Sequence, residues 1–189
     1  MSTLKIKNVV IGEGTPKIIV PLVGKTEEEI LKEAALVKEL APDVVEWRVD
    51  IYEHVEDLEA VKTMISKLRA AFDQELLLFT FRSHKEGGNK EISDAFYVEL
   101  NETAIRTKQI DLVDVELFNE KENVEKLVAA ANENGVFVIM SNHDFFKTPA
   151  KEEIISRLCK MQEYGAHIPK IAVMPQNVGD VLTLLDATY

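Results

Sequence analysis

Residues 44–50 read VVEWRVD, and polar and apolar side chains alternate along them. The polar side chains share one face of an extended strand: Glu46, Arg48 and Asp50. The apolar side chains share the opposite face: Val45, Trp47 and Val49. A parallel strand covered by helices on both faces is almost wholly apolar, whereas a barrel strand meets helices outside and can carry a polar site inside. The stretch therefore favours a β/α barrel over an open doubly wound sheet.

Further stretches have the short, β-branched composition of buried strands, and they cover 17–24, 76–83, 112–118, 136–143 and 170–176. Amphipathic helical patterns lie between and after the strands, over 26–40, 58–72, 93–107, 122–134, 150–164 and 181–189. The first helix opens with Thr26 and Glu29, which have the spacing of a capping box. Strict alternation of strand and helix predicts parallel βα units joined by right-handed crossovers.

The chain has 189 residues, whereas a complete (β/α)8 barrel needs at least roughly 200. We therefore expect an α/β fold of the (β/α)8 TIM-barrel type that is incomplete, with about six βα units in a single domain over residues 1–189. Residues 1–12 are expected to form a small extra hairpin or cap over one end. An incomplete barrel leaves its first and last strands as open edges, which favours self-association.

The composition narrows the range of functions. The chain carries 33 acidic and 22 basic residues, a net charge of −11, which disfavours nucleic acid and the anionic membrane surface as partners. No apolar run reaches the roughly 18 residues of a spanning helix, and residues 1–8 lack the apolar segment of a signal peptide, so we expect a cytoplasmic location. The single cysteine, Cys159, excludes an intramolecular disulfide and a cysteine-based zinc site, and its helical context predicts a buried thiol.

Candidate chemistry lies after strand ends, where β/α barrels place their active sites. Residues 82–88 (RSHKEGG) follow the third predicted strand and end in two glycines, which permit a flexible loop. The polar candidates in this loop are Arg82, His84, Lys85 and Glu86. A solvated charged turn is the alternative interpretation, and it is preferred for Lys85.

Two strands add further candidates. Glu46 and Arg48 point the same way, so they can bind a polar ligand or form an internal ion pair. His143 closes its strand and suits general acid–base work, although a structural histidine fits the same position. Lys170 begins an apolar strand. A neutral lysine amine is a nucleophile that forms imines with carbonyl compounds, but a strand-edge lysine can also extend to water.

Four motifs in order resemble type I 3-dehydroquinate dehydratase: EWRVD at 46–50, FTFRSHKEGG at 79–88, IMSNHDFFKTP at 139–149 and IPKIAVMPQ at 168–176. The opening IGEGTPKIIVPLVG at 11–24 is also similar to that family. The resemblance implies a (β/α)8-barrel lyase of the shikimate pathway of aromatic amino acid biosynthesis. Such an enzyme removes water from 3-dehydroquinate to give 3-dehydroshikimate through a lysine Schiff base, with no metal or organic cofactor. It also implies a cytoplasmic homo-oligomer, usually a dimer.

Carried over by motif, the resemblance makes Lys170 the Schiff-base lysine, which attacks the ring ketone. His143 becomes the general base for the neighbouring C–H proton and the general acid for the departing hydroxyl, while Glu86 pairs with it and holds its orientation. The remaining matched residues are expected to bind the substrate: Glu46, Trp47, Arg48 and Arg82.

Two departures from the family pattern matter. Pro21 stands in the first strand where relatives often have a serine, and no role is assigned to it. The chain also ends where the family continues for two more βα units, which supply an arginine for the substrate carboxylate and a lid with a serine and a glutamine. We therefore expect the imine chemistry to be retained and turnover to be weak or absent.

Two other functions stay open at this point. A metal-dependent sugar isomerase or epimerase of similar shape would hold its ion with groups at the strand ends: Glu46, Glu116, His143 and Asp144. The inward cations Arg48 and Lys170 oppose a divalent metal. A non-catalytic fragment that keeps the substrate contacts is the second alternative, and ligand binding without turnover would support it.

Overall fold

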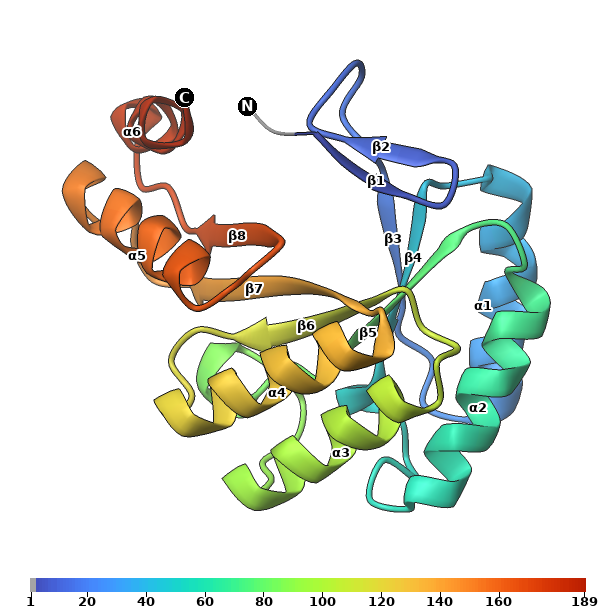
Figure 1. The fold of residues 1–189 in the computed structure, drawn as a ribbon. Coiled ribbons are helices and arrows are strands. Elements are labelled where there is room, and N and C mark those ends of the chain that lie inside the picture. The colour runs from blue at the N-terminus through green and yellow to red at the C-terminus, as the bar shows by residue number, and fades with distance from the viewer. Residues whose placement is uncertain (1–2) are drawn as a thin grey trace.

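The computed structural model describes residues 3–189. Six parallel strands form one curved sheet whose spatial order follows the chain (Figure 1). The strands are β3 (Ile19–Leu22), β4 (Val44–Arg48), β5 (Leu76–Thr80), β6 (Leu112–Glu116), β7 (Phe137–Asp144) and β8 (Ile168–Val173). The helices that follow them lie along the outer side of the curve and are α1 (Glu27–Leu40), α2 (Leu58–Ala71), α3 (Asp94–Arg106), α4 (Lys121–Asn134), α5 (Lys151–Glu163) and α6 (Val178–Thr188).

Every crossover returns to the adjacent strand, since each strand from β3 to β8 pairs in parallel with the next. Within residues 3–189, β3 and β8 are the two edges of the sheet and do not pair with each other. The fold is therefore a partial (β/α)8 barrel with six parallel strands. The expected α/β class and the expected incompleteness are both confirmed.

Local sequence signals explain where the helices begin. Thr26 caps α1 in a capping box, in which Glu29 N donates to Thr26 Oγ1 and Thr26 N donates to Glu29 Oε2, both over 3.2 Å. Asp57 and Ser93 cap α2 and α3 with their side-chain oxygens. These caps satisfy N–H groups that a first helical turn leaves unpaired, so they anchor the loops that run from strand ends into helices.

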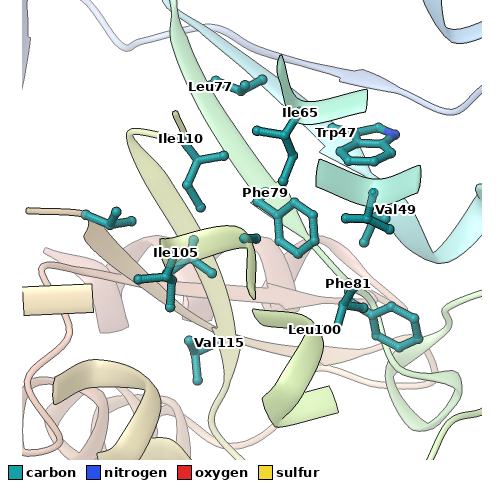
Figure 2. Close-up of a cluster of buried hydrophobic side chains, with 14 of the residues drawn as sticks. Trp47, Val49, Ile65, Leu77, Phe79, Phe81, Leu100, Ile105, Ile110 and Val115 are labelled. Carbon is teal, nitrogen blue, oxygen red and sulfur yellow. The ribbon is translucent and has the colours of Figure 1, made fainter. Parts of the chain in front are cut away.

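The main core lies between the sheet and the helices (Figure 2). Trp47, Phe79 and Phe81 point to this side from β4, from β5 and from the residues just after β5, and each is at most 1% exposed. Branched side chains from helices α1 to α4 and the connecting segments pack in the same cluster, among them Ile65, Leu100, Ile105 and Ile110. Because these apolar side chains occupy the outer face, the alternate positions of each strand face the concave side.

A hairpin covers the end of the barrel at which the strands begin. It consists of β1 (Leu4–Ile6) and β2 (Val9–Ile11), which pair antiparallel. Its buried side chains pack against the first residues of three strands: Val44, Leu76 and Leu112. The hairpin or cap expected from residues 1–12 is thus confirmed, with residues 1–2 lying outside the described residues. The opposite end, where the strands finish, is left as the open face.

Two expectations about local structure were wrong. Cys159 is exposed rather than buried, because it lies on a face of α5 that turns away from buried Ile154. Strand β8 begins at Ile168, two residues before its predicted start, because an edge strand tolerates Pro169. Lys170 therefore lies inside the strand. Among the described residues, no helix combines the length and the apolar character that a membrane crossing requires.

Candidate active site

Strand register places polar residues side by side on the concave face. Glu116 on β6 pairs with Ser141 on β7, and Ser141 pairs with Lys170 on β8. Side chains alternate along a strand, so Asp114 shares a face with Glu116, and His143 shares a face with Ser141. The candidate residues at the ends of separate strands therefore gather on one surface.

Arg82 binds three of these groups. Its guanidinium donates to Asp114 Oδ1 over 3.0 Å, to Glu116 Oε1 over 2.7 Å and to Ser141 Oγ over 3.0 Å. Burial opposes the positive charge of Arg82, but the carboxylates of Asp114 and Glu116 outweigh burial and raise the pKa of the guanidinium. Burial also raises the pKa of Glu116, against the opposing effect of Arg82. Arg82 is therefore a fixed cation held among carboxylates.

Glu86 and His143 form a close pair. His143 Nδ1 lies 2.8 Å from Glu86 Oε2, and the backbone N–H of His143 donates to the same oxygen over 3.1 Å. The other carboxylate oxygen accepts from Asn142 Nδ2 over 3.1 Å, and Glu86 is only 6% exposed. A carboxylate at Nδ1 favours the N–H at that nitrogen and leaves Nε2 as the basic nitrogen for a bound molecule.

Two glycines place Glu86 beneath the histidine. Gly87 has φ +81° and ends the short 3-10 helix η2 (His84–Glu86). Gly88 is buried against the preceding chain, so that a Cβ there would lie 1.7 Å from the carbonyl oxygen of Arg82. This position therefore requires glycine for close backbone approach, whereas the flexibility expected from the two glycines stays a prediction.

Lys170 faces the concave side beside the Arg82 cluster. Its Nζ lies 3.6 Å from Asp114 Oδ2, and its side chain is 35% exposed while that of Asp114 is fully buried. Burial favours the neutral acid at Asp114, but Arg82 and then Lys170, together with the hydroxyl of Ser141, hold the pKa of Asp114 below its ordinary value. The amine is thus open to a ligand on one side and faces a carboxylate on the other.

Glu46 and Arg48 share this face but bind different partners. Glu46 Oε1 accepts from Thr80 Oγ1 over 2.8 Å. Arg48 makes a two-pronged contact with Asp50, over 2.8 and 3.0 Å, and this hydrogen bonding raises the pKa of Arg48. Asp50 also accepts from the backbone N–H of Arg82. The internal ion pair that the sequence left open between Glu46 and Arg48 is therefore not formed, and Arg48 pairs with Asp50 instead.

Trp47 does not reach this site. Its ring lies 5.6 Å from that of Tyr52 and 5.7 Å from that of Phe79, in the core on the helix side of β4 (Figure 2). The expected contact between Trp47 and substrate was wrong, because β4 itself separates the indole from the concave face. His84 and Lys85 are exposed on their loop, which confirms the solvated turn preferred for Lys85.

The site also contains residues to which sequence reasoning gave no role: Asp50, Asp114, Ser141 and Asn142. A sequence signal exists for Asp114, because polar Asp114 and Glu116 alternate with apolar Val113 and Val115. Asn142 had none, because it joins the site through contacts that depend on tertiary packing. Its side chain donates to Glu86 and accepts from Arg157 on α5 over 2.8 Å.

The acidic and histidine side chains at the strand ends do not assemble a metal site. Among residues 3–189, no group of three His, Cys, Asp or Glu has positions that could hold a metal ion. Glu116 is bonded to Arg82, and Asp144 Oδ1 accepts from two loop N–H groups. This geometry does not favour the metal-dependent isomerase.

A partial β/α barrel with an inward lysine amine and a carboxylate–histidine pair on its concave face defines the class of barrel enzymes that act on carbonyl compounds. Residues 18–189 match the family model of type I 3-dehydroquinase. The chain belongs to the type I 3-dehydroquinase family. The 3-dehydroquinate dehydratase of Bacillus subtilis is 62% identical over all 189 residues, which span 74% of that protein.

Solved structures agree with this assignment. The type I 3-dehydroquinate dehydratase of Clostridium difficile, crystallised with covalently modified comenic acid, superposes with a TM-score of 0.97 at 53% identity. That match covers 98% of this chain and 74% of the other. The 3-dehydroquinate dehydratase of Enterococcus faecalis gives a TM-score of 0.95 at 45% identity, covering 98% and 77% of the two chains.

Proposed function

We propose that this chain dehydrates 3-dehydroquinate to 3-dehydroshikimate, a lyase reaction of the shikimate pathway, through an imine at Lys170. The observation that carries the proposal is the partly exposed side chain of Lys170 on the same concave face as the Glu86–His143 pair. Lys170 pairs with Ser141 and His143 with Ala172, so the lysine and the histidine are diagonal neighbours on adjacent strands.

In the proposed mechanism, Lys170 Nζ attacks the ketone carbon and gives a carbinolamine, which loses water to become a protonated imine. His143 then removes a proton from the adjacent carbon, and the electron pair moves toward the imine nitrogen. The pair returns as the neighbouring hydroxyl leaves, and His143 gives back its proton so that water departs. Hydrolysis of the imine consumes one water and releases product, so the cycle removes one water from the substrate.

Glu86 is proposed to orient the imidazole, because it binds both Nδ1 and the backbone N–H of His143. Glu46, Arg48 and Arg82 are proposed to contact the hydroxyls and polar rim of the substrate. Three N–H interactions of Arg82 are already formed within the protein. Its part in substrate binding is therefore confined to its remaining N–H groups.

We further propose a cytoplasmic homo-oligomer, with a dimer as the simplest form. Its support is the pair of edge strands and the apolar side chains exposed near them: Ile18, Ile19, Leu182 and Leu185. Light scattering on the purified protein tests the assembly. A monodisperse monomer at micromolar concentration would contradict it.

The test of the reaction is intact-mass spectrometry after incubation with 3-dehydroquinate and sodium borohydride, which reduces an imine to a stable amine. We expect one adduct in the wild-type protein and in Lys85→Ala, which removes an exposed lysine of the η2 loop. We expect none in Lys170→Ala. Absence of the adduct from the wild-type protein, or its persistence in Lys170→Ala, would overturn the proposal.

A further inference from the structure

Asp114 has two carboxylate oxygens in very different surroundings. Oδ1 accepts from Ser141 Oγ over 2.7 Å and from Arg82 Nη2 over 3.0 Å. Oδ2 is buried and has no hydrogen-bond partner within residues 3–189. A buried carboxylate oxygen without a partner is costly, so its presence in this site calls for an explanation.

The unpartnered oxygen faces the amine of Lys170. Oδ2 and Nζ are 3.6 Å apart, which is longer than a hydrogen bond but within ion-pair distance. The two residues come from β6 and β8, which are separated by β7, and the contact is possible because both side chains point to the concave face. Arg82 and Ser141 hold the carboxylate by its other oxygen, so the orientation of Oδ2 toward Lys170 is fixed.

We propose that Asp114 is a positioning residue whose carboxylate is the counter-charge for the nitrogen of Lys170, both as the free amine takes up a proton and as the protonated imine forms. The second part rests on the proposed function, because it requires the imine. The first part concerns the protein without substrate and can be tested separately.

The chemistry explains why such a counter-charge is useful. A protonated imine withdraws electrons from the adjacent carbon far more strongly than a neutral imine does, so proton removal by His143 depends on the nitrogen keeping its charge. Loss of that proton is opposed by a negative charge at 3.6 Å in a buried setting. Asp114 is itself ionised, since Arg82 and Lys170 hold its pKa below the ordinary value against the effect of burial.

The other ionisable groups around Asp114 cannot act as the counter-charge for Lys170. Glu116 binds Arg82 and the backbone N–H of Ser83 through Oε1. Glu86 is engaged by His143 and Asn142. The buried Tyr97 hydroxyl accepts from Glu116 N, and burial raises its pKa, so it stays neutral. Asp114 is therefore the carboxylate placed to balance a charge on Lys170.

The test compares Asp114→Asn with Glu116→Gln. Both variants keep the side-chain shape and remove one carboxylate from Arg82, but only Asp114→Asn removes the charge that faces Lys170. The amide oxygen of Asn at 114 can still accept from Arg82 and Ser141. Any effect that passes through Arg82 should therefore be common to both variants.

The first measurement needs no substrate. Each protein is treated with trace acetic anhydride at pH 7, and acetylation of Lys170 is measured by peptide mapping relative to exposed Lys160 in the same sample. We expect Asp114→Asn to react about tenfold faster than the wild-type protein at Lys170, because the negative charge that faces Nζ at 3.6 Å is removed. We expect Glu116→Gln to stay within about twofold of the wild-type protein.

The second measurement uses protein labelled with 15N at the lysine side chains and incubated with 3-dehydroquinate. The nitrogen chemical shift distinguishes a protonated imine from a neutral one. We expect the protonated form in the wild-type protein and in Glu116→Gln, and a larger neutral fraction in Asp114→Asn. A wild-type protein that forms no imine would refute the proposed function, while the acetylation result would still decide the role of Asp114.

The inference would be overturned if Lys170 were acetylated at the same rate in Asp114→Asn and in the wild-type protein. It would also be overturned if Glu116→Gln increased the acetylation rate of Lys170 as much as Asp114→Asn does. If Asp114→Asn fails to fold, the reciprocal variant Lys170→Met provides the test. Coupling between two charges acts equally in both directions, so removing Lys170 should raise the pKa of Asp114 relative to the wild-type protein. The 13C signal of the Asp114 carboxyl group measures this titration in Lys170→Met. An unchanged titration would refute the proposed pairing.

Discussion

Replacing Arg82 by methionine should destabilise the protein severely, because it removes the guanidinium that pairs with two buried carboxylates, Asp114 and Glu116. The side chains of Arg82, Asp114 and Glu116 are 5%, 0% and 4% exposed, so water cannot replace the lost guanidinium. Removing one partner of a buried ion pair costs about 3–5 kcal/mol, a large part of a typical total stability of about 5–15 kcal/mol. With a urea dependence of about 1–3 kcal/mol per molar, the unfolding midpoint should fall by roughly 1–5 M.

The loss of stability should also depend on pH. In the wild-type protein, Arg82 helps to hold the pKa of Asp114 below its ordinary value. Without Arg82, less opposes burial, which therefore favours the neutral acids at Asp114 and Glu116 more strongly. The gap between the variant and the wild-type protein should therefore be widest near pH 8 and narrow as the pH falls toward 4, where protonation removes the buried charges.

Urea unfolding followed by circular dichroism at pH 4, 6 and 8 measures both effects. Arg106→Met is the matched control, since Arg106 forms a pair with Glu102 on the exposed face of α3 and its side chain is 69% exposed. That variant should lose less than about 1 kcal/mol at every pH. A loss of this small size in Arg82→Met, or a loss that does not change with pH, would refute the argument from buried charge.

Three further predictions concern the same site. Gly88→Ala should lower kcat at least tenfold and destabilise the fold. The Cβ of the alanine would lie 1.7 Å from the carbonyl oxygen of Arg82 and would displace the loop that carries Glu86. Steady-state kinetics and thermal unfolding measure the two effects. Asn142→Ala should lower kcat several-fold with little change in KM, since it removes a donor to Glu86 but no proposed substrate contact. Asp114→Asn should be less stable than the wild-type protein at pH 7. The pKa of Asp114 is lower in the folded protein than in the unfolded chain, so its carboxylate stabilises the fold at pH values above the unfolded-state pKa. The difference in stability between the two proteins should therefore close as the pH falls below about 4 and the carboxyl group becomes protonated.

Each of these predictions has a control or a contrary result. Gly14→Ala changes a glycine that also has a positive φ but has open space around it, so it should leave kcat unchanged. Asn134→Ala removes an amide that bonds a carbonyl of its own helix α4, at the helix end that leads into the start of β7 and not at the strand ends that carry the site, and it should not affect turnover. A KM increase with unchanged kcat in Asn142→Ala would argue against an orienting role. A stability gap between Asp114→Asn and the wild-type protein that stays constant with pH would contradict the ionised state of Asp114.

The sequence predicted well whatever depends on periodicity within one element. The alternation in VVEWRVD correctly put Glu46 and Arg48 on one face and Trp47 on the other. The error at Trp47 arose when a motif was carried over as a block, including the residue whose parity pointed into the core. Periodicity within the strand was therefore more reliable than adjacency within the motif.

The features that the sequence did not predict depend on contacts between elements. The start of β8 was misplaced because Pro169 resembles a loop residue, and only its edge position makes it compatible with a strand. Gly88 looked like a source of flexibility, although its close approach to Arg82 becomes visible only once the loop has folded back. The burial of Cys159 was inferred from its helical context, but burial depends on what packs on that face.

The cations of the concave face differ in how tightly a carboxylate holds them, and the difference follows their proposed roles. Arg48 and Arg82 each have carboxylate contacts of 3.0 Å or less, which suits cations that never change their charge. Lys170 must lose its proton to attack a ketone, and a close, aligned hydrogen bond to a carboxylate would hold that proton. At 3.6 Å, Asp114 still opposes loss of charge from the imine without a directional bond to the amine. The longer contact is therefore the one that the proposed nucleophile requires.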